Sequence, residues 1–465
     1  MTENKKENLN IVRGRVMIAA PSSGSGKTVI TIGLIESLKR KGHKAISYKC
    51  GPDYIDPMFH KEVLGIPSEN LDTWFYDKKG IEGILARAPK ETDISIMEGV
   101  MGLYDGLGGT REEGSAYHLA ELTDTPIVLV IDAGHMGRTV IALLMGLLSY
   151  DRSQLIKGVI LNHTGKTMYE TLAPLIREEL GIEALGYLPK LKELHIESRH
   201  LGLKLPGEID DLHQQIAKLA DTRSETVDLE GILKIAGAAA GSLALAGSAQ
   251  NKAGLRLAVA QDEAFCFYYE ENFRLLRERG VEIVPFSPLH DKRLPENIDG
   301  LLIGGGYPEL YPEQLAENAS MRTAIRHALE SGLPSLAECG GFMYLHDTIR
   351  VHVLGAAEET EYPMVGVVAG SCYNTGKLNR FGYVELQAEN NGPVIRGHEF
   401  HYYESSNQGE DLTALKPVSG KQWKTGFMTE KSLWGFPHLY YGSCPQFVDR
   451  FVEAMKKEHE NRENR

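Results

Sequence analysis

Residues 15–28 read RVMIAAPSSGSGKT: a short apolar run, a turn rich in glycine and serine, and the start of a helical pattern. Backbone N–H groups of such a loop, with the N-terminus of the following helix, cradle phosphate oxygens, and the lysine reaches the β- and γ-phosphates. The strict pattern G-x-x-x-x-G-K-[ST] fails at its first position, which is Pro21. The rest still predicts nucleotide-phosphate binding, by Ser23, Gly24, Ser25, Gly26, Lys27 and Thr28.

Apolar runs and helical patterns alternate on both sides of an interruption. In the first half, further strand-like runs occupy residues 45–48, 94–97, 126–132 and 158–162. After a stretch rich in Ala, Gly and Ser, at residues 235–250, strand-like runs follow at 257–260, 281–286, 300–303 and 334–337. Alternation of this kind predicts an α/β fold with parallel sheets. We expect a nucleotide-binding domain at 1–235, a linker at 236–252 (a small-residue helix is an equal alternative) and a second α/β domain at 253–465.

Composition restricts the partners and the compartment. The 465 residues carry 50 Lys and Arg against 63 Asp and Glu, a net charge of −13, which disfavours nucleic acid and anionic membrane surfaces as partners. The dispersed cysteines form no C-x-x-C pair, which favours a reduced, cytoplasmic protein. Its apolar runs are shorter than the ~20 residues that span a bilayer, and its polar start does not resemble a signal peptide.

Two acidic residues follow predicted strands close to the phosphate loop. Asp53 lies in GPDYIDP, residues 51–57, and Glu98 directly follows the run at 94–97. Carboxyl ends of parallel strands meet at one edge of a sheet, and Mg²⁺ on phosphates typically takes one or two carboxylates beside a hydroxyl. We therefore predict a Mg²⁺ site from Thr28, Asp53 and Glu98, with solvated loop acids as the alternative. Asp105, in the glycine-rich loop at 98–106, could equally be a turn-former.

A candidate nucleophile stands between a strand and a helical pattern. Residues 335–341 read SLAECGG, and a cysteine on such a turn is exposed, with its thiol pKa lowered by the helix N-terminus. We expect Cys339 to act with His438 as its base, because the base of such a cysteine is usually distant in sequence. The glycines Gly305, Gly306 and Gly340 are expected to donate N–H groups to an oxyanion.

Two other readings concern this half of the chain. Cys339 could be a buried inert thiol. His398 and His401 lie in RGHEFHYY, residues 396–403, where their i, i+3 spacing in a strand-like stretch favours a structural or substrate-lining role over a metal site.

The chain resembles the cobyrinate a,c-diamide synthase family, in the cobyrinic acid/cobyric acid synthase group of class I-type glutamine amidotransferases, over nearly its whole length. The stretches that carry the resemblance are APSSGSGKT, GPDYIDPMFH, EGVMGLYDG, GGGYPE, ECGGFMYL, GHEFHYY and the segment around His438. The resemblance implies an N-terminal P-loop domain similar to dethiobiotin synthetase, with a parallel sheet, and a C-terminal class I glutamine amidotransferase α/β domain.

The resemblance also implies roles for individual residues. Cys339 would attack the amide of glutamine and His438 would move the proton. Asn162 matches a position that contacts adenine, and Asp53, Tyr54 and Asp105 match a site for the substrate carboxylate. The third acid of most class I triads lies two residues after the histidine, but Tyr440 stands there in this chain. The group that orients His438 is therefore missing or different.

The reaction implied is an ATP- and Mg²⁺-dependent amidation of the a and c carboxylates of cobyrinate, in corrinoid biosynthesis, through acyl phosphates. Glutamine hydrolysis at Cys339 would supply the ammonia. The partners would then be ATP, L-glutamine and a tetrapyrrole polycarboxylate, bound by a monomer or homodimer. A polycarboxylate substrate would call for a basic patch near the phosphate loop, for which Lys166 and Arg199 are candidates.

Two alternatives to this reaction stay open. Nickel sirohydrochlorin, amidated in coenzyme F430 biosynthesis, requires the same phosphate and thiol chemistry. A nucleotide-switched partitioning-type ATPase is disfavoured, because its signature lysine five residues before the P-loop lysine is Ser22 here. Such ATPases also lack an amidotransferase half.

Overall fold

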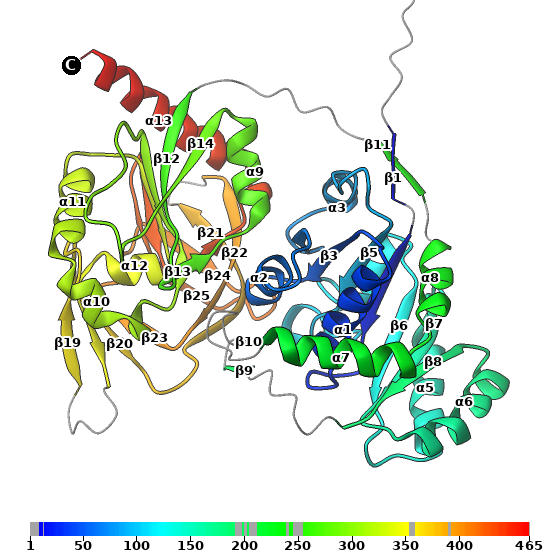
Figure 1. Ribbon diagram of the computed structural model, residues 1–465. Coiled ribbons are helices and arrows are strands. Elements are labelled where there is room, and N and C mark those ends of the chain that lie inside the picture. Colours follow the sequence, from blue (N-terminus) through cyan, green and yellow to red (C-terminus); the bar gives the residue numbers. More distant parts are fainter. Residues whose placement is uncertain are drawn as a thin grey trace, which may run out of the picture. The chain divides into compact units, whose positions relative to one another are not determined.

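The apolar runs of the N-terminal half form a parallel sheet. The structure, a computed structural model, describes residues 9–12, 14–190, 198–199, 202–203, 212–238, 241–244, 254–352, 359–388 and 392–464. Within these ranges the sheet has seven strands in the order β4-β3-β5-β2-β6-β7-β8, with every neighbouring pair parallel (Figure 1). Every residue of β2 and β3 is buried, so both faces of the sheet are covered.

The strands of this sheet are β2 (Arg15–Ala19), β3 (Ala45–Cys50), β4 (Ser68–Leu71), β5 (Ile94–Glu98), β6 (Ile127–Asp132), β7 (Ile156–Asn162) and β8 (Glu183–Leu188). The helices of the same half are α1 (Lys27–Arg40), α2 (Ile55–Glu62), α3 (Lys78–Leu85), α4 (Ala116–Leu122), α5 (Thr139–Tyr150), α6 (Lys166–Leu180), α7 (Leu212–Thr226) and α8 (Leu229–Gly237). Two short pairs, β1 (Leu9–Val12) with β11 (Gly241–Ala244) and β9 (Ser198–Arg199) with β10 (Gly202–Leu203), stand apart from the sheet.

The chain divides into two units, Met1–Gly247 and Ser248–Arg465. Part of the linker predicted at 236–252 is regular structure, because it includes the end of α8 and the whole of β11. Residues 239–240 and 245–253 lie outside the described residues.

The second unit contains a sheet in the order β14-β12-β15-β17-β27-β26, parallel except for β26. Two further sheets were not foreseen: an antiparallel one, β25-β24-β21-β22-β28, and a mixed one, β19-β18-β20-β23. Their strands mix buried, half-buried and exposed positions without a regular two-residue period, so the sequence pattern did not predict them.

The strands of the second unit are β12 (Leu255–Ala260), β13 (Phe265–Phe267), β14 (Val281–Phe286), β15 (Gly300–Ile303), β16 (Gly305–Gly306), β17 (Ser335–Glu338), β18 (His346–Val351), β19 (Thr360–Pro363), β20 (Val368–Asn374), β21 (Arg380–Ala388), β22 (Val394–His401), β23 (Tyr403–Ser405), β24 (Leu412–Leu415), β25 (Gln422–Thr425), β26 (Phe427–Met428), β27 (Ser432–Gly435) and β28 (His438–Leu439). Its helices are α9 (Glu270–Glu278), α10 (Pro312–Glu317), α11 (Ala319–Glu330), α12 (Gly340–Tyr344) and α13 (Pro445–Glu463).

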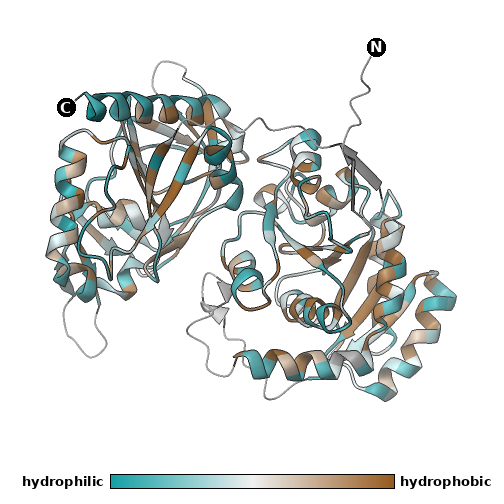
Figure 2. Cartoon of the chain, turned by 45° about the horizontal axis from the view of Figure 1, so that its top comes forward, coloured by the Kyte–Doolittle hydropathy of each residue, from teal (hydrophilic) through white to brown (hydrophobic). Residues whose placement is uncertain are grey.

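The cores follow the sheets. Figure 2 shows hydrophobic residues concentrated in the sheet strands of each unit, whereas α13 carries many hydrophilic ones. In the second unit, one buried cluster includes Phe342 and Tyr344, and a second includes Leu257 and Phe451. No helix in the described part of the chain is long and apolar enough to cross a membrane.

Leu129→Ala tests the core of the first unit. Leu129 is fully buried in β6, between β2 and β7, so the truncation leaves a cavity. We expect the free energy of unfolding of this unit to fall by about 2–5 kcal/mol, measured by urea denaturation. Met145→Ala is the control, because Met145 is 52% exposed; its effect should stay within about 0.5 kcal/mol. An equal loss in both variants would contradict this account of the core.

Candidate active sites

The phosphate loop is held in shape by a glycine and an asparagine. Gly26, directly before α1, has φ 92° and ψ 19°, in the left-handed region that favours glycine. A Cβ atom on Gly26 would lie 2.2 Å from Nδ2 of Asn162. That Nδ2 donates a hydrogen bond to the Ser25 carbonyl oxygen at 2.9 Å. Asn162, at the end of β7, thus braces the loop from a neighbouring strand, and its predicted contact with adenine stays a prediction.

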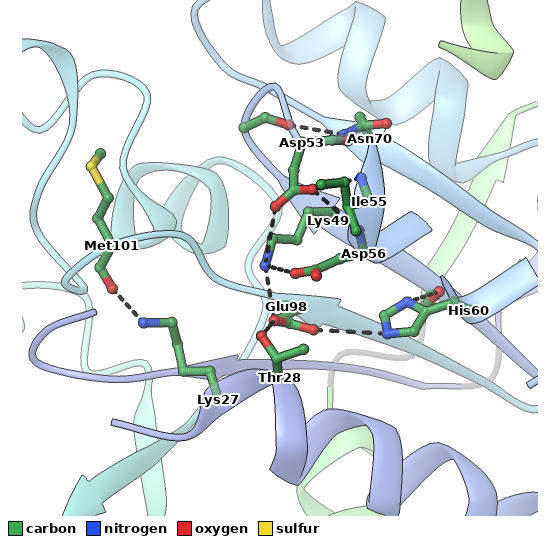
Figure 3. A network of polar contacts seen from close by, with 12 residues as sticks. Lys27, Thr28, Lys49, Asp53, Ile55, Asp56, His60, Asn70, Glu98 and Met101 are labelled. Carbon is green, nitrogen blue, oxygen red and sulfur yellow. Dashed lines mark hydrogen bonds and ion pairs between the residues drawn. The ribbon is translucent and has the colours of Figure 1, made fainter. Parts of the chain in front are cut away.

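Lys27 points across the loop towards the segment after β5. Its Nζ donates to the carbonyl oxygens of Met101, at 2.5 Å, and Ser22, at 3.1 Å (Figure 3). Burial, and then the charge of Lys49, lower the pKa of Lys27 to about 8. Both acceptors are neutral carbonyl groups, which phosphate oxygens can replace as partners of the ammonium group.

A buried cluster of charges lies beside the loop (Figure 3). Thr28 Oγ1 donates to Glu98 Oε1 at 2.6 Å, and Lys49 Nζ stands 2.8 Å from the same oxygen. Lys49 also donates to Asp56 and lies 3.8 Å from Asp53 Oδ2. Thr28 and Glu98, which the sequence placed in one site, do converge, and Asp53 lies at the edge of the same cluster.

Burial sets the proton affinities in this cluster. It raises the pKa of Glu98 to about 7, against the opposing charge of Lys49. It also raises the pKa of Asp53 to about 6, assisted by the charge of Asp56. Burial alone lowers the pKa of Lys49, but Asp56, Glu98 and Asp53 together raise it well above its usual value. The lysine is therefore a permanent cation that holds the carboxylates together.

Sequence reasoning missed two members of the cluster, Lys49 and Asp56. The signal for Asp56 was available, because it lies three residues after Asp53 in the same GPDYIDP segment. Asp53 Oδ1 accepts hydrogen bonds from the backbone N–H groups of Ile55 and Asp56, which fixes the start of α2. Lys49 carried no signal, because a single lysine in an apolar run reads as a strand-end charge.

The donor set fits a magnesium ion. Hydroxyl and carboxylate oxygens are the hard ligands that Mg²⁺ takes, and it is usually held by one or two carboxylates together with phosphates. Glu98 Oε2 is buried with no hydrogen-bond partner among the described residues, and His60 Nε2 lies 3.9 Å from it. In the described part of the chain, no group of three or more His, Cys, Asp or Glu is arranged to hold a metal by itself. Such an arrangement suits an ion that takes its remaining ligands from a bound nucleotide.

The remaining residues predicted for the first unit are those expected to bind the substrate. Asp105 Oδ2 accepts a hydrogen bond from Gly102 N–H at 3.0 Å, so it forms the turn that the sequence left as an alternative. Tyr54 is buried directly before α2. Of the expected basic patch, Lys166 is exposed and 3.9 Å from Glu170, and the side chain of Arg199 lies outside the described residues. Substrate contacts of these residues stay predictions.

In the second unit, Cys339 stands on a strained turn between β17 and α12. Its φ of 48° and ψ of −106° fall in a region that non-glycine residues rarely adopt. Its N–H donates to the Gly435 carbonyl oxygen at 2.9 Å. A Cβ atom on Gly341 would lie 2.0 Å from the carbonyl oxygen of Ile303. The turn is therefore tightly packed at Gly341, and Cys339 itself carries backbone strain.

The predicted thiol environment was wrong. Cys339 is only 7% exposed, and burial raises its pKa, with the charges of Glu309 and Glu399 adding to the effect. The helix that follows has five residues, so its N-terminus does not outweigh this burial. The resting group is a neutral thiol, which needs a base to lose its proton.

The glycines predicted to bind an oxyanion lie around the thiol and the histidine. A Cβ atom on Gly340 would be 3.1 Å from the Gly306 nitrogen, and one on Gly305 would be 2.3 Å from Cε1 of His438. These approaches bring Gly305, Gly306 and Gly340 together with His438. Backbone N–H groups at such a place can stabilise a developing negative charge.

His438 is a buried, neutral imidazole. Burial, and then the charge of His401, lower its pKa to about 3. Its ring stacks on His398, with ring centres 4.9 Å apart, and these two residues pair across β22 and β28. Tyr269 Oη lies 3.1 Å from Nδ1 of His398. A neutral imidazole has a free ring nitrogen that can accept a proton.

The place of the missing triad acid is aromatic. Tyr440 is fully buried and packs edge-on against Tyr269, with ring centres 4.8 Å apart. Sequence reasoning missed Glu338, the buried acidic residue that directly precedes Cys339 in the chain. It accepts hydrogen bonds from Leu439 N–H and from the Tyr441 hydroxyl, each at 3.2 Å. Glu338 therefore connects the strand before Cys339 to the segment that carries His438. In the sequence, the only indication of a role for Glu338 was its position directly before Cys339 in ECGG.

Comparison with known proteins gives the class of this chain. Residues 16–203 match a family model described as the CobQ/CobB/MinD/ParA nucleotide binding domain. Residues 256–440 match the CobB/CobQ-like glutamine amidotransferase domain. The fold is thus an α/β P-loop nucleotide-binding domain followed by a glutamine amidotransferase domain. Partitioning ATPases of the MinD/ParA type fall under the first description alone.

Full-length relatives give the family. The chain is 39% identical to the cobyrinate a,c-diamide synthase of Caldanaerobacter subterraneus subsp. tengcongensis, over 94% of this chain and 97% of that protein. It is 37% identical to proteins of the same name from Priestia megaterium and Dehalococcoides mccartyi, over 95% of this chain and 97% and 98% of theirs. The chain belongs to the cobyrinate a,c-diamide synthase family and is an ATP-dependent, glutamine-hydrolysing carbon–nitrogen ligase.

Gly26→Ala tests the geometry of the phosphate loop. The added Cβ would clash with Asn162 and hold a left-handed conformation that costs about 1–2 kcal/mol. We expect ATP affinity, measured by calorimetry, to fall about tenfold or more. Gly83→Ala, within α3, is the matched control, because its Cβ meets only the end of the Arg87 side chain at 3.7 Å. Unchanged ATP affinity in the Gly26 variant would rule out this loop as the nucleotide site.

Glu338→Gln tests the buried carboxyl group beside Cys339. Burial raises the pKa of Glu338 to about 8, so between about pH 5 and 8 the folded protein keeps a proton that the unfolded chain releases. This group alone should therefore lower stability by about 1.4 kcal/mol per pH unit as pH rises through that window. Urea unfolding of the second unit should show a less negative slope in the variant than in the wild type. Parallel slopes would show that Glu338 is ionised in the folded state.

Proposed function

We propose that this enzyme amidates the a and c side-chain carboxylates of cobyrinate, using ATP and glutamine. One observation supports the proposal: the same chain brings Gly305 close to His438 and Gly340, next to Cys339, close to Gly306, and also places Thr28 against Glu98 beside a phosphate loop. The first arrangement suits release of ammonia from glutamine, and the second suits activation of a carboxylate by ATP. Relatives matched over about 95% of this chain are named for cobyrinate.

In the amidotransferase domain, the proposed chemistry begins from a neutral thiol and a neutral imidazole. His438 accepts the proton of Cys339 as Sγ bonds to the side-chain amide carbon of glutamine. Negative charge develops on the amide oxygen, where the N–H groups of Gly305, Gly306 and Gly340 stabilise it. The C–N bond breaks, ammonia leaves with the proton from His438, and water hydrolyses the thioester to glutamate.

In the nucleotide-binding domain, a carboxylate oxygen of the macrocycle attacks the γ-phosphorus of ATP, giving an acyl phosphate and ADP. Lys27 stabilises the charge on the transferring phosphoryl group, and the other loop residues, 23–26 and Thr28, bind the phosphates. Mg²⁺, held by Thr28, Glu98 and Asp53, would neutralise phosphate charge. Ammonia then displaces phosphate to give the amide, and two rounds give the diamide.

The remaining predicted residues are assigned by position. We infer that Asn162 contacts adenine through its Oδ1, which is buried without a hydrogen-bond partner among the described residues. Asp53, Tyr54 and Asp105 are placed near the reacting carboxylate. The synthetase activity is assigned to residues 1–235 and the glutaminase activity to residues 253–465, with 236–252 as the connection.

Cys339→Ala separates the two activities. Without the thiol, glutamine-dependent ADP release should fall by about 10³-fold or more, because no thioester can form. Ammonia-dependent ADP release should stay within about threefold of the wild type, because the acyl phosphate forms elsewhere. Cys444→Ala, which also removes a buried thiol, is the control and should keep both activities. Loss of the ammonia-dependent reaction in the Cys339 variant would contradict the division of labour.

The same assay identifies the acceptor. Cobyrinate and nickel sirohydrochlorin are offered side by side, because the phosphate and thiol chemistry cannot distinguish them. We expect ADP release and diamide formation with cobyrinate. Turnover of nickel sirohydrochlorin alone would move the enzyme to F430 biosynthesis, and no turnover of either would overturn the substrate assignment.

A further inference from the structure

A buried carboxylate in the amidotransferase domain has no hydrogen-bond partner. Glu399 lies on β22 and is 1% exposed, yet neither carboxylate oxygen has a hydrogen-bond partner among the described residues. Burying a carboxylate without such partners costs several kcal/mol, so buried carboxylates are normally hydrogen-bonded or paired with a cation. The chemistry described above makes no use of this group.

Two cationic candidates act near Glu399, and neither forms a hydrogen bond with it. The charge of Lys416 interacts with Glu399, but its Nζ donates to the carbonyl oxygens of residues 381–383. His401 Nε2 lies 3.8 Å from Glu399 Oε1, beyond hydrogen-bond distance. His401 Nδ1 lies 2.6 Å from the carbonyl oxygen of Tyr403, which can only accept, so Nδ1 carries a proton. The ring is further fixed by stacking on Phe436, with ring centres 4.3 Å apart. His401 is therefore held too far from Glu399 to donate a hydrogen bond to it, and the Glu399 oxygens can still accept hydrogen bonds from another group.

The position of Glu399 relates it to the reacting groups. His401, which lies on the same face of β22 as Glu399, stacks on Phe436, and Phe436 packs against Phe342 of the helix that follows Cys339, with ring centres 5.2 Å apart. The charge of Glu399 also acts on the nucleophile, because it adds to burial and to Glu309 in raising the pKa of Cys339. Glu309 is only half-buried and has an interaction partner within the protein. Glu399 is thus the carboxylate near the thiol that most needs a cation.

We propose that Glu399 binds the α-ammonium group of the glutamine substrate. Glutamine carries this cation four bonds from the carbon that Cys339 attacks, so one molecule can present both ends to neighbouring groups. A buried carboxylate would accept charge-assisted hydrogen bonds from the ammonium group, which are stronger than neutral ones. This inference rests on the proposed glutamine hydrolysis at Cys339, and it adds the residue that recognises glutamine as an amino acid.

Binding of the ammonium group at Glu399 would also change the charge next to Cys339. Before glutamine binds, the negative charge of Glu399 disfavours the thiolate. Once the ammonium group neutralises that charge, the proton passes more easily from Cys339 to His438. Substrate binding would then activate the nucleophile, and an amide without an α-ammonium group would be bound weakly and cleaved slowly.

The test compares glutamine with glutaramate, which keeps the side-chain amide and the carboxylate but lacks the α-amino group. Hydrolysis of each is followed by ammonia release, in the full-length enzyme and in Glu399→Gln. We expect the wild type to prefer glutamine by about 30-fold or more in kcat/KM, because a buried charge pair is lost with the analogue. In Glu399→Gln the preference should fall to about threefold or less, mainly through a higher KM for glutamine.

Two further variants show whether the charge of Glu399 itself causes the preference for glutamine. Glu399→Asp keeps the charge and should keep part of the preference, whereas Glu385→Gln, on β21 and 3.4 Å from Arg396, should keep all of it. Ammonia-dependent ADP release reports the integrity of the protein and of the other domain. Equal use of the two amides by the wild type, or an unchanged preference in Glu399→Gln, would overturn the inference. If glutamine is hydrolysed but no macrocycle is amidated, the acceptor assignment fails while the inference on Glu399 stands.

Discussion

A turn with a positive φ angle between a buried strand and a helix lies at both candidate sites of this chain. In the loop between β2 and α1, Gly26 adopts the left-handed conformation without strain, directly before Lys27. Between β17 and α12, Cys339 has φ 48° and ψ −106°, a combination that carries strain in a non-glycine residue. In both cases the turn points the reacting group out of the carboxyl edge of a parallel sheet, where open α/β sheets place their ligands.

Burial determines which groups are charged and which are neutral in the two candidate sites. In the nucleotide-binding domain, Lys49 is a permanent cation among Glu98, Asp56 and Asp53, so three carboxylates can share a small volume next to the phosphate loop. In the amidotransferase domain, burial disfavours the charged forms of both Cys339 and His438, so both groups are neutral in the absence of substrate. Burial therefore has opposite results in the two domains. The charged cluster around Lys49 keeps its charges because they are paired, whereas Cys339 and His438 remain neutral.

Sequence reasoning reached the parts of this account that local patterns encode. The strand-like runs predicted at 15–20 and 94–97 correspond to β2 and β5, and the predicted phosphate loop lies between β2 and α1. The pairing of Cys339 with His438 stays a prediction. The burial of Cys339 could not be predicted from the sequence, because it depends on strands that are far away along the chain. Lys49 and Glu338 were missed because each is a single charged residue in an apolar stretch, and Glu399 was given no role within RGHEFHYY. The role of each comes from neighbours that the fold brings to it.

The central claim is that a carboxylate activated by ATP in one domain receives ammonia released in the other. The most direct test uses macrocycle whose carboxylates carry ¹⁸O, turned over with ATP and glutamine, and measures ¹⁸O in the released phosphate by mass spectrometry. The account predicts one ¹⁸O atom transferred to phosphate for each amide formed, because the acyl phosphate keeps the bridging oxygen of the substrate on phosphorus when ammonia attacks the carbonyl carbon. Amide formation with no ¹⁸O in the phosphate would contradict it.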